Sequence, residues 1–456
     1  MAMTAKSNSA RVGILTLGCK VNQYESEAMA EELTRRGFLA TDAGEVCDAY
    51  IINTCTVTAE AARKSRQMIR RLRSRSPGAR IVVTGCLAQT TPAELARLAG
   101  VDSVIGNAKK LAAVDEIERL LGEGAKDSPA TARTDAPALN GCAFEPMRIA
   151  SFARTRVYLK IEDGCENRCS YCIIPDARGP VRSKPRGEVL SEISGLIGGG
   201  AREIVVTGIE VASYGRDLGD TDLGSLLCDI DALPEVRAND VRIRLGSLEP
   251  SLMRPDFIEH IAALRSLAPH FHISLQSGCS STLAAMRRKY NAERAMRVME
   301  DLRAAIPGVQ FTCDVIAGFP GESEADHAET LDFMRRARFL AAHVFPYSKR
   351  DGTPAATMPD QVPEDVKHRR AAEISALSGE IRREILCDAA ASAITRRVLF
   401  ESFQDGHAVG HTDSFIEVRV PSAEDLHGRR MTVCLLGVET DPRYEYGSVC
   451  TGEIVK

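Results

Sequence analysis

Three cysteines stand close together in the middle of the chain, where Cys165, Cys169 and Cys172 form a CxxxCxxC run. Three thiolates within eight residues stay within reach of one another, so this spacing favours a single metal centre. A closed four-cysteine site needs one more nearby ligand, and the next cysteine, Cys228, lies far along the chain. Three ligands on a four-iron cluster would leave one iron open to bind a substrate. A three-ligand zinc site or a coincidence is the alternative interpretation.

Three more cysteines, Cys19, Cys55 and Cys86, each follow a short apolar run. In doubly wound sheets the loops at the carboxyl ends of the strands converge on one crevice, so the sequence predicts a second three-thiolate cluster there. A buried structural cysteine is the alternative for each of the three taken alone. Core packing is the better interpretation for most of the other eight cysteines, which are Cys47, Cys142, Cys228, Cys279, Cys313, Cys387, Cys434 and Cys450.

The elements that must position the second set alternate between buried strands and polar helices, which predicts an open doubly wound sheet. The expected strands are residues 12–17, 49–52, 80–83 and 102–105, and the expected helices are residues 24–36, 58–73 and 92–98. After them, residues 122–146 are rich in Ala, Gly, Pro, Thr and Asp, a composition typical of a linker.

A second alternating series follows and predicts a parallel, barrel-like sheet, closed or partial, with its chemistry on the carboxyl-end loops. Its expected strands are residues 155–161, 203–206, 241–245, 270–275, 310–316 and 339–345, and its helices are residues 188–197, 254–264, 292–305 and 324–336. A charged helix at 363–384 then leads to short β-like runs at 395–400, 416–420, 431–436 and 448–455, which predict a small all-β barrel.

The expected fold is therefore α/β with three domains. We place the doubly wound parallel sheet at residues 9–121, a linker at 122–148, a partial (β/α)6 barrel at 149–385 and the all-β barrel at 387–456.

Composition excludes several classes of protein. With 456 residues, 44% of them hydrophobic and 26% charged, the chain can bury large cores and is neither disordered nor fibrous. No run of 18 apolar residues predicts a transmembrane helix, and the polar first ten residues predict no secretory signal. Fourteen cysteines in such a chain favour metal ligands over a disulfide framework. We expect a cytoplasmic protein.

The net charge is only −4, so any nucleic acid must bind to local basic patches. Residues 63–80 hold eight basic and no acidic side chains, which favours phosphate binding over a merely solvated helix face. These are Arg63, Lys64, Arg66, Arg70, Arg71, Arg73, Arg75 and Arg80. Further candidates are Arg178, Arg182, Lys184 and Arg186 near the CxxxCxxC run, and Arg396, Arg397, Arg429 and Arg430 in the otherwise acidic tail.

The CxxxCxxC run resembles the radical S-adenosylmethionine (SAM) motif, and with the preceding trio and the terminal β module nearly the whole chain resembles the radical SAM methylthiotransferases. The resemblance implies a cluster domain, a radical SAM core and a C-terminal TRAM domain. Segments 16–22, 53–58 and 343–350 resemble the MtaB type, which modifies threonylcarbamoyladenosine in tRNA. Other members of the family modify isopentenyladenosine in tRNA or an aspartate of a ribosomal protein.

The resemblance also implies the cofactors. Carbon 2 of adenine bears a hydrogen that no ordinary base removes, whereas a radical can abstract it. The family implies one [4Fe–4S] cluster on Cys165, Cys169 and Cys172, which binds SAM and generates the radical. A second [4Fe–4S] cluster, on Cys19, Cys55 and Cys86, would hold the sulfur. The candidate residues of the SAM pocket are Tyr171, Gly208, Glu210, Ser247, Gln276 and Gly318. No catalytic side chain is assigned.

We therefore expect an enzyme that inserts a methylthio group at carbon 2 of N6-threonylcarbamoyladenosine, next to the anticodon of tRNA. The expected partners are the tRNA anticodon stem-loop, a reducing electron donor and a sulfur source, with no membrane. The alternatives are the modification of isopentenyladenosine in tRNA and a non-catalytic iron–sulfur protein that binds RNA.

Overall fold

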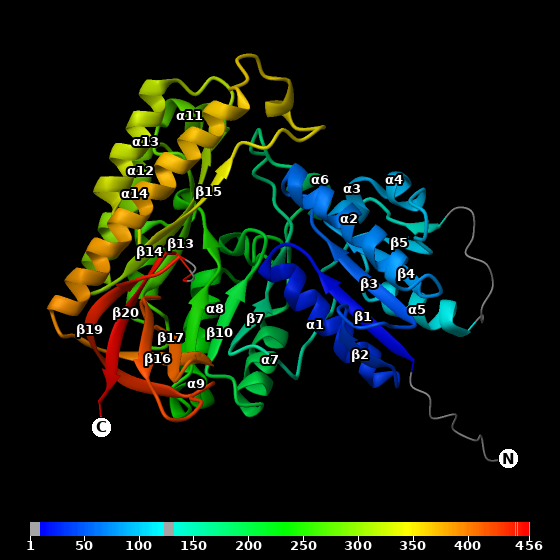
Figure 1. The fold of residues 1–456 in the computed structure, drawn as a ribbon, viewed down its shortest axis with the longest axis horizontal. Helices are drawn as coiled ribbons and strands as arrows, with labels where there is room; N and C mark the ends of the chain where they lie inside the picture. The colour runs from blue at the N-terminus through cyan, green and yellow to red at the C-terminus, as the bar shows by residue number, and fades with distance from the viewer. Residues whose placement is uncertain (1–9, 123–131, 443, 445, 456) are drawn as a thin grey trace.

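The computed structural model describes residues 10–122, 132–442, 444 and 446–455. Figure 1 shows the sheet domain of the N-terminal residues on one side, an α/β core in the middle, and an all-β barrel of the C-terminal residues on the other side of the core. The long helix α14 (Glu364–Ala391) runs along the core and leads into the barrel. The predicted α/β fold with a terminal β barrel is confirmed.

The first domain is a six-stranded parallel sheet with the strand order β2-β1-β3-β4-β5-β6. Helix residues Ile69 and Leu95 pack on one face of the sheet, and Met29 and Ile117 pack on the other, so the sheet is doubly wound as predicted. The strands are β1 (Arg11–Thr16), β2 (Leu39–Asp42), β3 (Ala49–Thr54), β4 (Arg80–Gly85), β5 (Ser103–Ile105) and β6 (Arg133–Asp135), and the helices are α1 (Lys20–Arg35), α2 (Ala59–Arg75), α3 (Cys86–Thr90), α4 (Pro92–Ala96) and α5 (Ala112–Gly122).

Four elements of this domain, β2, α3, α5 and β6, were not expected. Strand β2 is a short, polar edge strand, and α5 lies next to the segment interpreted as a linker. Strand β6 lies inside that segment and pairs with β5, so part of the expected linker extends the first sheet. Its three residues are exposed and show no apolar alternation that sequence could have revealed. Residues 123–131 of the expected linker lie outside the described residues.

The core contains the predicted series of parallel strands. β11, β10 and β7 form one sheet, and β12, β13, β14 and β15 form another, while β11 and β12 follow each other across Gly246. Among the described residues β7 and β15 each pair with a single strand, so they are the edges of an open barrel. The strands are β7 (Arg156–Lys160), β10 (Glu203–Thr207), β11 (Arg242–Leu245), β12 (Ser247–Leu248), β13 (His270–Gln276), β14 (Gln310–Ala317) and β15 (Ala341–Pro346).

Amphipathic helices cover the outside of this open barrel and bury residues such as Ile193, Leu226, Ile261, Val298 and Phe333 against it. The helices are α7 (Arg186–Gly198), α8 (Leu223–Ala232), α9 (Pro234–Ala238), α10 (Pro255–Ala262), α11 (Ser280–Ala285), α12 (Ala292–Ala305) and α13 (Glu324–Ala337). The hairpin of β8 (Glu162–Asp163) and β9 (Arg182–Ser183) brackets the CxxxCxxC loop and the short helix α6 (Ile174–Arg178).

The C-terminal module is a closed barrel with the strand order β16-β17-β18-β20-β19. Its strands are β16 (Thr395–Gln404), β17 (His407–Thr412), β18 (Glu417–Pro421), β19 (Arg430–Thr440) and β20 (Ser448–Ile454). Strand β17 was not predicted, because its sequence HAVGHT interrupts the apolar pattern with histidines and a glycine. Helix α14 is longer than residues 363–384 and includes Cys387, so the barrel begins after the expected boundary.

The barrel is docked on the core by buried arginines. Arg242 donates to the carbonyl oxygen of Thr412 at 3.0 Å, and Arg382 donates to that of Ser448 at 3.0 Å.

In the part of the chain that the structure describes, no helix is long and apolar enough to cross a membrane.

Candidate functional site

The contiguous cysteine trio lies on the loop between β8 and α6. Gly164, at φ +106°, turns the chain just before Cys165, and its backbone lies so close to Pro180 that a side chain would collide there. The amide of Cys165 donates to the carbonyl oxygen of Gly179 at 3.0 Å, and that of Cys172 donates to the carbonyl oxygen of Cys169 at 3.0 Å. Backbone contacts therefore fix the loop that carries all three thiols.

These thiols are held in a buried setting. Burial raises the pKa of Cys165 and of Cys172 to about 12, so both are neutral without a metal to compensate the thiolate charge. Arg288 donates through Nη1 to the Cys169 sulfur at 3.1 Å and pairs with Glu249 at 3.0 Å. A buried guanidinium against one sulfur fits a thiolate ligand set.

The second trio is assembled from three strand ends of the first sheet. Cys19 precedes α1, Cys55 follows β3, and Cys86 begins α3 directly after β4. A Cβ at Gly18, the neighbour of Cys19, would lie 3.0 Å from the Cys55 sulfur. Burial and the negative charge of Cys86 raise the pKa of Cys55 to about 11. The three residues therefore meet at one edge of the sheet, as the topology predicts.

A buried arginine joins the two cysteine regions. Arg178 ends α6, six residues after Cys172, and donates through Nε to the Cys86 sulfur at 3.2 Å. It also donates to Glu25 of α1 at 2.6 Å and to Asp163 of β8 at 3.2 Å. Because the same side chain contacts both domains, it fixes the second trio relative to the loop that carries the first.

The charges around Arg178 form a closed, buried network. Lys110 pairs with Glu25, while Lys160 pairs with Glu25 at 2.8 Å and with Asp163 at 2.7 Å. Burial alone would raise the pKa of Glu25, but Arg178, Lys110 and Lys160 outweigh it and hold that pKa well below its usual range. The cations outnumber the carboxylates here, which suits a neighbouring set of thiolates.

This arrangement corrects one expectation. Arg178, Arg182 and Lys184 were candidates for an RNA-binding patch, but all three are buried. They form ion pairs inside the protein, Arg178 and Arg182 with Asp163 and Lys184 with Glu192. Arg186 is exposed and pairs with Asp229. Their spacing gave no signal for burial, because the acidic partners are distant in the sequence.

A cavity of about 610 Å³ opens between all three domains. Cys19 and Lys20 line it from the first domain, Gly208 and Ser247 from the strand ends of the core, and Phe415 from the terminal barrel. Burial and the positive charges of Arg156 and Arg244 lower the pKa of Lys20. Two of the predicted SAM-pocket residues thus share one cavity with a cysteine of the second trio.

Glu210 is the most informative of the remaining SAM-pocket candidates. Burial and the charge of Glu249 raise its pKa to about 8, and it is close enough to raise the pKa of Cys165 in turn. Its Oε1 and the Oε1 of Glu162 are buried and have no hydrogen-bond partner within the described residues. Orphaned carboxyl oxygens are costly, so they fit a cationic ligand such as SAM, which carries a sulfonium and an amino group.

Of the other three candidates, Tyr171 and Gly318 make packing contacts. The Tyr171 ring packs edge-on against Phe319 with their centroids 6.5 Å apart. Gly318, at φ +73°, lies where a side chain would meet Lys367 at 2.5 Å, and its amide donates to Glu322. Gln276 ends β13 at φ +68°. Their roles in SAM binding stay predictions.

The contacts of two buried arginines with the cysteines were not predicted. Arg178 and Arg288 each donate to a cysteine sulfur, yet neither belongs to the motif of the cysteine that it contacts. Among the described residues, no three His, Cys, Asp or Glu side chains have the spacing of a single metal ion.

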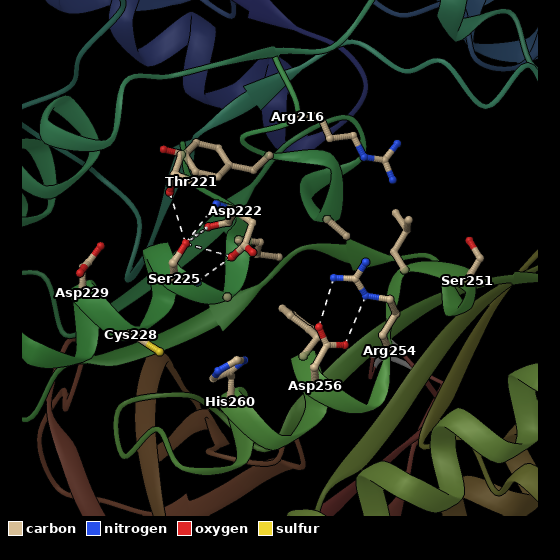
Figure 2. A pocket seen from close by; sticks show the side chains of 16 residues that line it. Arg216, Thr221, Asp222, Ser225, Cys228, Asp229, Ser251, Arg254, Asp256 and His260 are labelled. Atoms are coloured by element: carbon tan, nitrogen blue, oxygen red, sulfur yellow. Dashed lines mark hydrogen bonds and ion pairs between the residues drawn. The ribbon is translucent and has the colours of Figure 1, made fainter. Parts of the chain in front are cut away.

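A second cavity of about 610 Å³ lies beside α8 and α10 (Figure 2). Its polar side chains bond among themselves, since Asp222 accepts from the amide of Ser225 at 2.8 Å and Arg254 pairs with Asp256 at 3.2 Å. Cys228 lines this cavity rather than the core, and no cysteine trio surrounds it. The central cavity, which Cys19 lines, is therefore the better candidate for the active site.

The basic helix α2 divides into anchoring and outward-facing residues. Arg73 binds the carbonyl oxygens of Gly100 and Pro77, and Arg75 binds those of Ala43, Gly44 and Glu45, so both hold the sheet domain together. Arg80 pairs with Asp102, Arg63 and Lys64 with Glu60, and Arg66 with Glu94. Arg70 and Arg71 are exposed and form no ion pair with the described residues.

The basic residues of the terminal barrel divide in a similar way. Arg397 and Arg430 both pair with Asp240 of the core, so they serve domain packing. Arg429 pairs with Glu424 within the barrel. Arg396 forms no ion pair with the described residues and donates to the carbonyl oxygen of Thr395 at 3.5 Å.

Comparisons with known proteins agree with this geometry. The model of the radical SAM superfamily matches residues 159–334, and the model described as uncharacterized protein family UPF0004 matches residues 11–106. The chain is 38% identical over 433 residues to the threonylcarbamoyladenosine tRNA methylthiotransferase MtaB of Bacillus subtilis, covering 94% of each chain. A tRNA-2-methylthio-N(6)-dimethylallyladenosine synthase of Carboxydothermus hydrogenoformans is 35% identical, covering 82% of this chain and 84% of that one.

A solved structure shares the fold. The radical SAM methyltransferase TsrM from Kitasatospora setae, with cobalamin and a [4Fe–4S] cluster bound, aligns with a TM-score of 0.55 at 17% identity, over 76% of this chain and 77% of that one. The MtaB protein of Thermotoga maritima is 39% identical over 360 residues, which cover 79% of this chain. The chain belongs to the radical SAM methylthiotransferase family, in which its relatives of MtaB type are similar to it over most of its length.

Proposed function

We propose that this enzyme inserts a methylthio group at carbon 2 of N6-threonylcarbamoyladenosine in the anticodon stem-loop of tRNA. The observation that carries the proposal is the central cavity, into which Cys19 and the strand ends at Gly208 and Ser247 all open. A base bound there would lie between the sulfur-carrying trio and the radical core. The similarity to the threonylcarbamoyladenosine tRNA methylthiotransferases of Bacillus subtilis and Thermotoga maritima supports the threonylcarbamoyl substrate.

The reaction needs a radical because the hydrogen on carbon 2 of adenine has no useful acidity. When bound, SAM and two [4Fe–4S] clusters supply the radical and the sulfur chemistry. Cys165, Cys169 and Cys172 would hold one cluster, and Cys19, Cys55 and Cys86 would hold the other. The task of the protein is to align these groups and to exclude water.

Arg178 and Arg288 contribute through their contacts with sulfur. Each places a buried positive charge on one cysteine of a trio, and such hydrogen bonds adjust the reduction potential of a cluster. Glu210, whose Oε1 has no hydrogen-bond partner among the described residues, would accept the cationic part of SAM. The loop after β15 adds a further link, because Arg350 donates to Thr56 beside Cys55 at 2.6 Å.

The tRNA would approach over basic residues at the surface. Arg70 and Arg71 of α2 are available for phosphate contacts. A reducing electron donor and a sulfur source complete the proposed set of partners, and the cytoplasm is the proposed place of action.

The test is nucleoside mass spectrometry of tRNA from a strain that lacks the gene. We expect the 2-methylthio form of threonylcarbamoyladenosine to disappear and to return with the wild-type gene, but not with a Cys165→Ala copy. Loss of methylthiolated isopentenyladenosine instead would establish the alternative substrate. An unchanged set of modified nucleosides, together with no SAM cleavage by reduced protein, would favour a non-catalytic RNA-binding protein.

A further inference from the structure

The inner end of the central cavity is unusually cationic. Arg156 and Arg244 both line it, and their guanidinium carbons lie 5.0 Å and 4.9 Å from the centre of the Phe415 ring. Lys20 lines the cavity from α1 and forms no hydrogen bond or ion pair with any described residue. Three cationic side chains from two domains therefore face one space.

Arg244 has a donor to spare at this place. Its Nε donates to Glu203 at 2.7 Å, and its Nη2 donates to the carbonyl oxygen of Asp413 at 3.2 Å. Its Nη1 is buried and has no hydrogen-bond partner in the described part of the chain, although the residue is only 3% exposed. A buried, unsatisfied guanidinium nitrogen is costly unless a ligand accepts from it.

The local carboxylates do not balance these cations. Glu203 is shared between Arg244 and Arg242, with the Arg242 pair at 2.9 Å. Glu401 pairs with Arg156 at 3.0 Å, and Asp314, the acidic residue of the cavity wall, pairs with His272 at 3.0 Å. Asp314 also lies close enough to Lys20 to interact with its charge. These three carboxylates nevertheless face four cations, Arg156, Arg242, Arg244 and Lys20, so the cavity has room for one more negative charge.

We infer that the inner end of the cavity is a carboxylate-binding pocket, in which Arg244 Nη1 donates to the carboxylate of the threonylcarbamoyl group and Lys20 neutralises it. This inference rests on the proposed function. Carbon 2 and carbon 6, which bears the N6 substituent, flank N1 of adenine, and their exocyclic bonds point in different directions, so carbon 2 can face the cysteines while the substituent extends toward Arg244. An isopentenyl group would leave both cations without a partner, which disfavours that substrate.

The experiment compares stem-loops that differ by one charge. Fluorescence anisotropy would measure the binding of anticodon stem-loop RNA with threonylcarbamoyladenosine, with its methyl ester, or with unmodified adenosine. The ester keeps the shape of the group and removes its charge. We expect wild-type protein to bind the acid at least about tenfold more tightly than the ester, and Arg244→Gln and Lys20→Gln to reduce that preference to less than about threefold.

Arg242→Gln is the matched control. Arg242 is equally buried, lies on the same strand and pairs with the same Glu203, but it does not line the cavity. We expect it to keep the wild-type preference even if its melting temperature falls. If Arg244→Gln does not fold, Lys20→Gln, which breaks no hydrogen bond or ion pair with the described residues, decides alone.

The outcomes separate the pocket from the proposed function. Wild-type preference for the acid that survives both Arg244→Gln and Lys20→Gln would overturn the pocket and leave the function intact. An equal loss in Arg242→Gln would also overturn it, because the effect would then be structural. If wild-type protein binds the acid and the ester equally yet methylthiolates the acid, that result would contradict the carboxylate-binding pocket but not the proposed function. Failure to methylthiolate any threonylcarbamoyl stem-loop would instead count against the proposed function.

Discussion

The two cysteine trios are assembled in different ways, but both use a glycine turn directly before a cysteine. One comes from a single loop of eight residues, and the other from three strand ends spread over residues 19–86. Yet Gly164, Gly18 and Gly85, each directly before a cysteine, have φ values of +106°, +104° and +98°. Glycine adopts this backbone without steric cost, so it turns each cysteine out of its strand. The same glycine turn therefore serves both a motif that is local in the sequence and one that is assembled by the fold.

The electrostatic surroundings of the trios differ more. Beside the contiguous trio, burial and a neighbouring carboxylate raise the pKa of Glu210 to about 8. Beside the assembled trio, Arg178 and the lysines outweigh burial and lower the pKa of Glu25 and of Asp163. At neutral pH the first region therefore has a carboxyl group ready to lose a proton, whereas the carboxylates of the second are already ionised.

The largest effect is expected from a variant that disrupts the assembled trio while all of its cysteines stay in place. In Gly85→Ala the new Cβ collides with the backbone of Thr54, and the backbone strain adds about 1–3 kcal/mol. We expect the iron content of reconstituted protein to fall from about eight to about four atoms per chain while SAM cleavage persists. Gly78→Ala, whose Cβ would meet nothing within 4 Å, is the control. Full iron content in Gly85→Ala would contradict this assembly.

The next largest effect is expected when either buried arginine, Arg178 or Arg288, is replaced with Gln. Arg178→Gln removes a donor from Cys86, and Arg288→Gln removes one from Cys169. Because a cationic donor stabilises the reduced, more negative cluster, each variant should lower the potential of its own cluster by on the order of 60 mV. Redox titration followed by electron paramagnetic resonance measures both signals. A shift of the same cluster in both variants would refute the separate pairing. Arg178→Gln should also cost about 3 kcal/mol of stability, since it leaves buried carboxylates behind.

The contiguous trio could be predicted from the sequence more directly than the assembled trio. The spacing of Cys165, Cys169 and Cys172 is local, so it was visible directly. Cys19, Cys55 and Cys86 could be grouped only because apolar runs marked the strands before them. Arg178 was misread as a surface residue, because Glu25 meets it only after two domains have packed together and Asp163 meets it only when the loop between β8 and β9 folds. The exposed strand β6 and the irregular strand β17 carry too little apolar pattern to be recognised.

Beside the contiguous trio, the affinity for SAM should depend on pH through Glu210. With its pKa near 8, Glu210 is protonated at pH 6.5, and binding of cationic SAM favours its ionised form. SAM affinity should therefore rise by up to about tenfold per pH unit below pH 8 and level off above it. Isothermal titration calorimetry in buffers of different ionisation enthalpy should detect proton release at pH 7. A profile that keeps this slope in Glu210→Gln would assign it to another group.

The same shift has a consequence for stability without ligand. The folded pKa of Glu210, about 8, exceeds its ordinary value of 4.5, so the folded state binds the extra proton between these limits. Its contribution to the free energy of unfolding is present below pH 4.5 and is lost as the pH rises toward 8. Glu210→Gln should flatten that part of the stability profile. An unchanged slope would contradict the assigned pKa.

The smallest expected effect lies on the surface of the domain that holds the assembled trio. Replacing Arg70 and Arg71 with Gln should weaken tRNA binding several-fold and reduce the dependence of log K on log salt by about one unit for each phosphate that the protein no longer neutralises. Filter binding at several salt concentrations measures the slope. Arg63→Gln is a control, because Arg63 already pairs with Glu60 at 2.7 Å. Unchanged slopes would return α2 to the role of a solvated helix face.

The most direct test of two separate centres is the triple variant Cys19→Ala, Cys55→Ala, Cys86→Ala, reconstituted without oxygen. Iron and sulfide would be counted, 5′-deoxyadenosine measured after reduction with SAM, and methylthiolated nucleoside sought in tRNA. The account predicts about four irons per chain, SAM cleavage comparable to wild type and no methylthiolated product. Loss of SAM cleavage together with the sulfur insertion, or a wild-type chain with a single cluster, would contradict it.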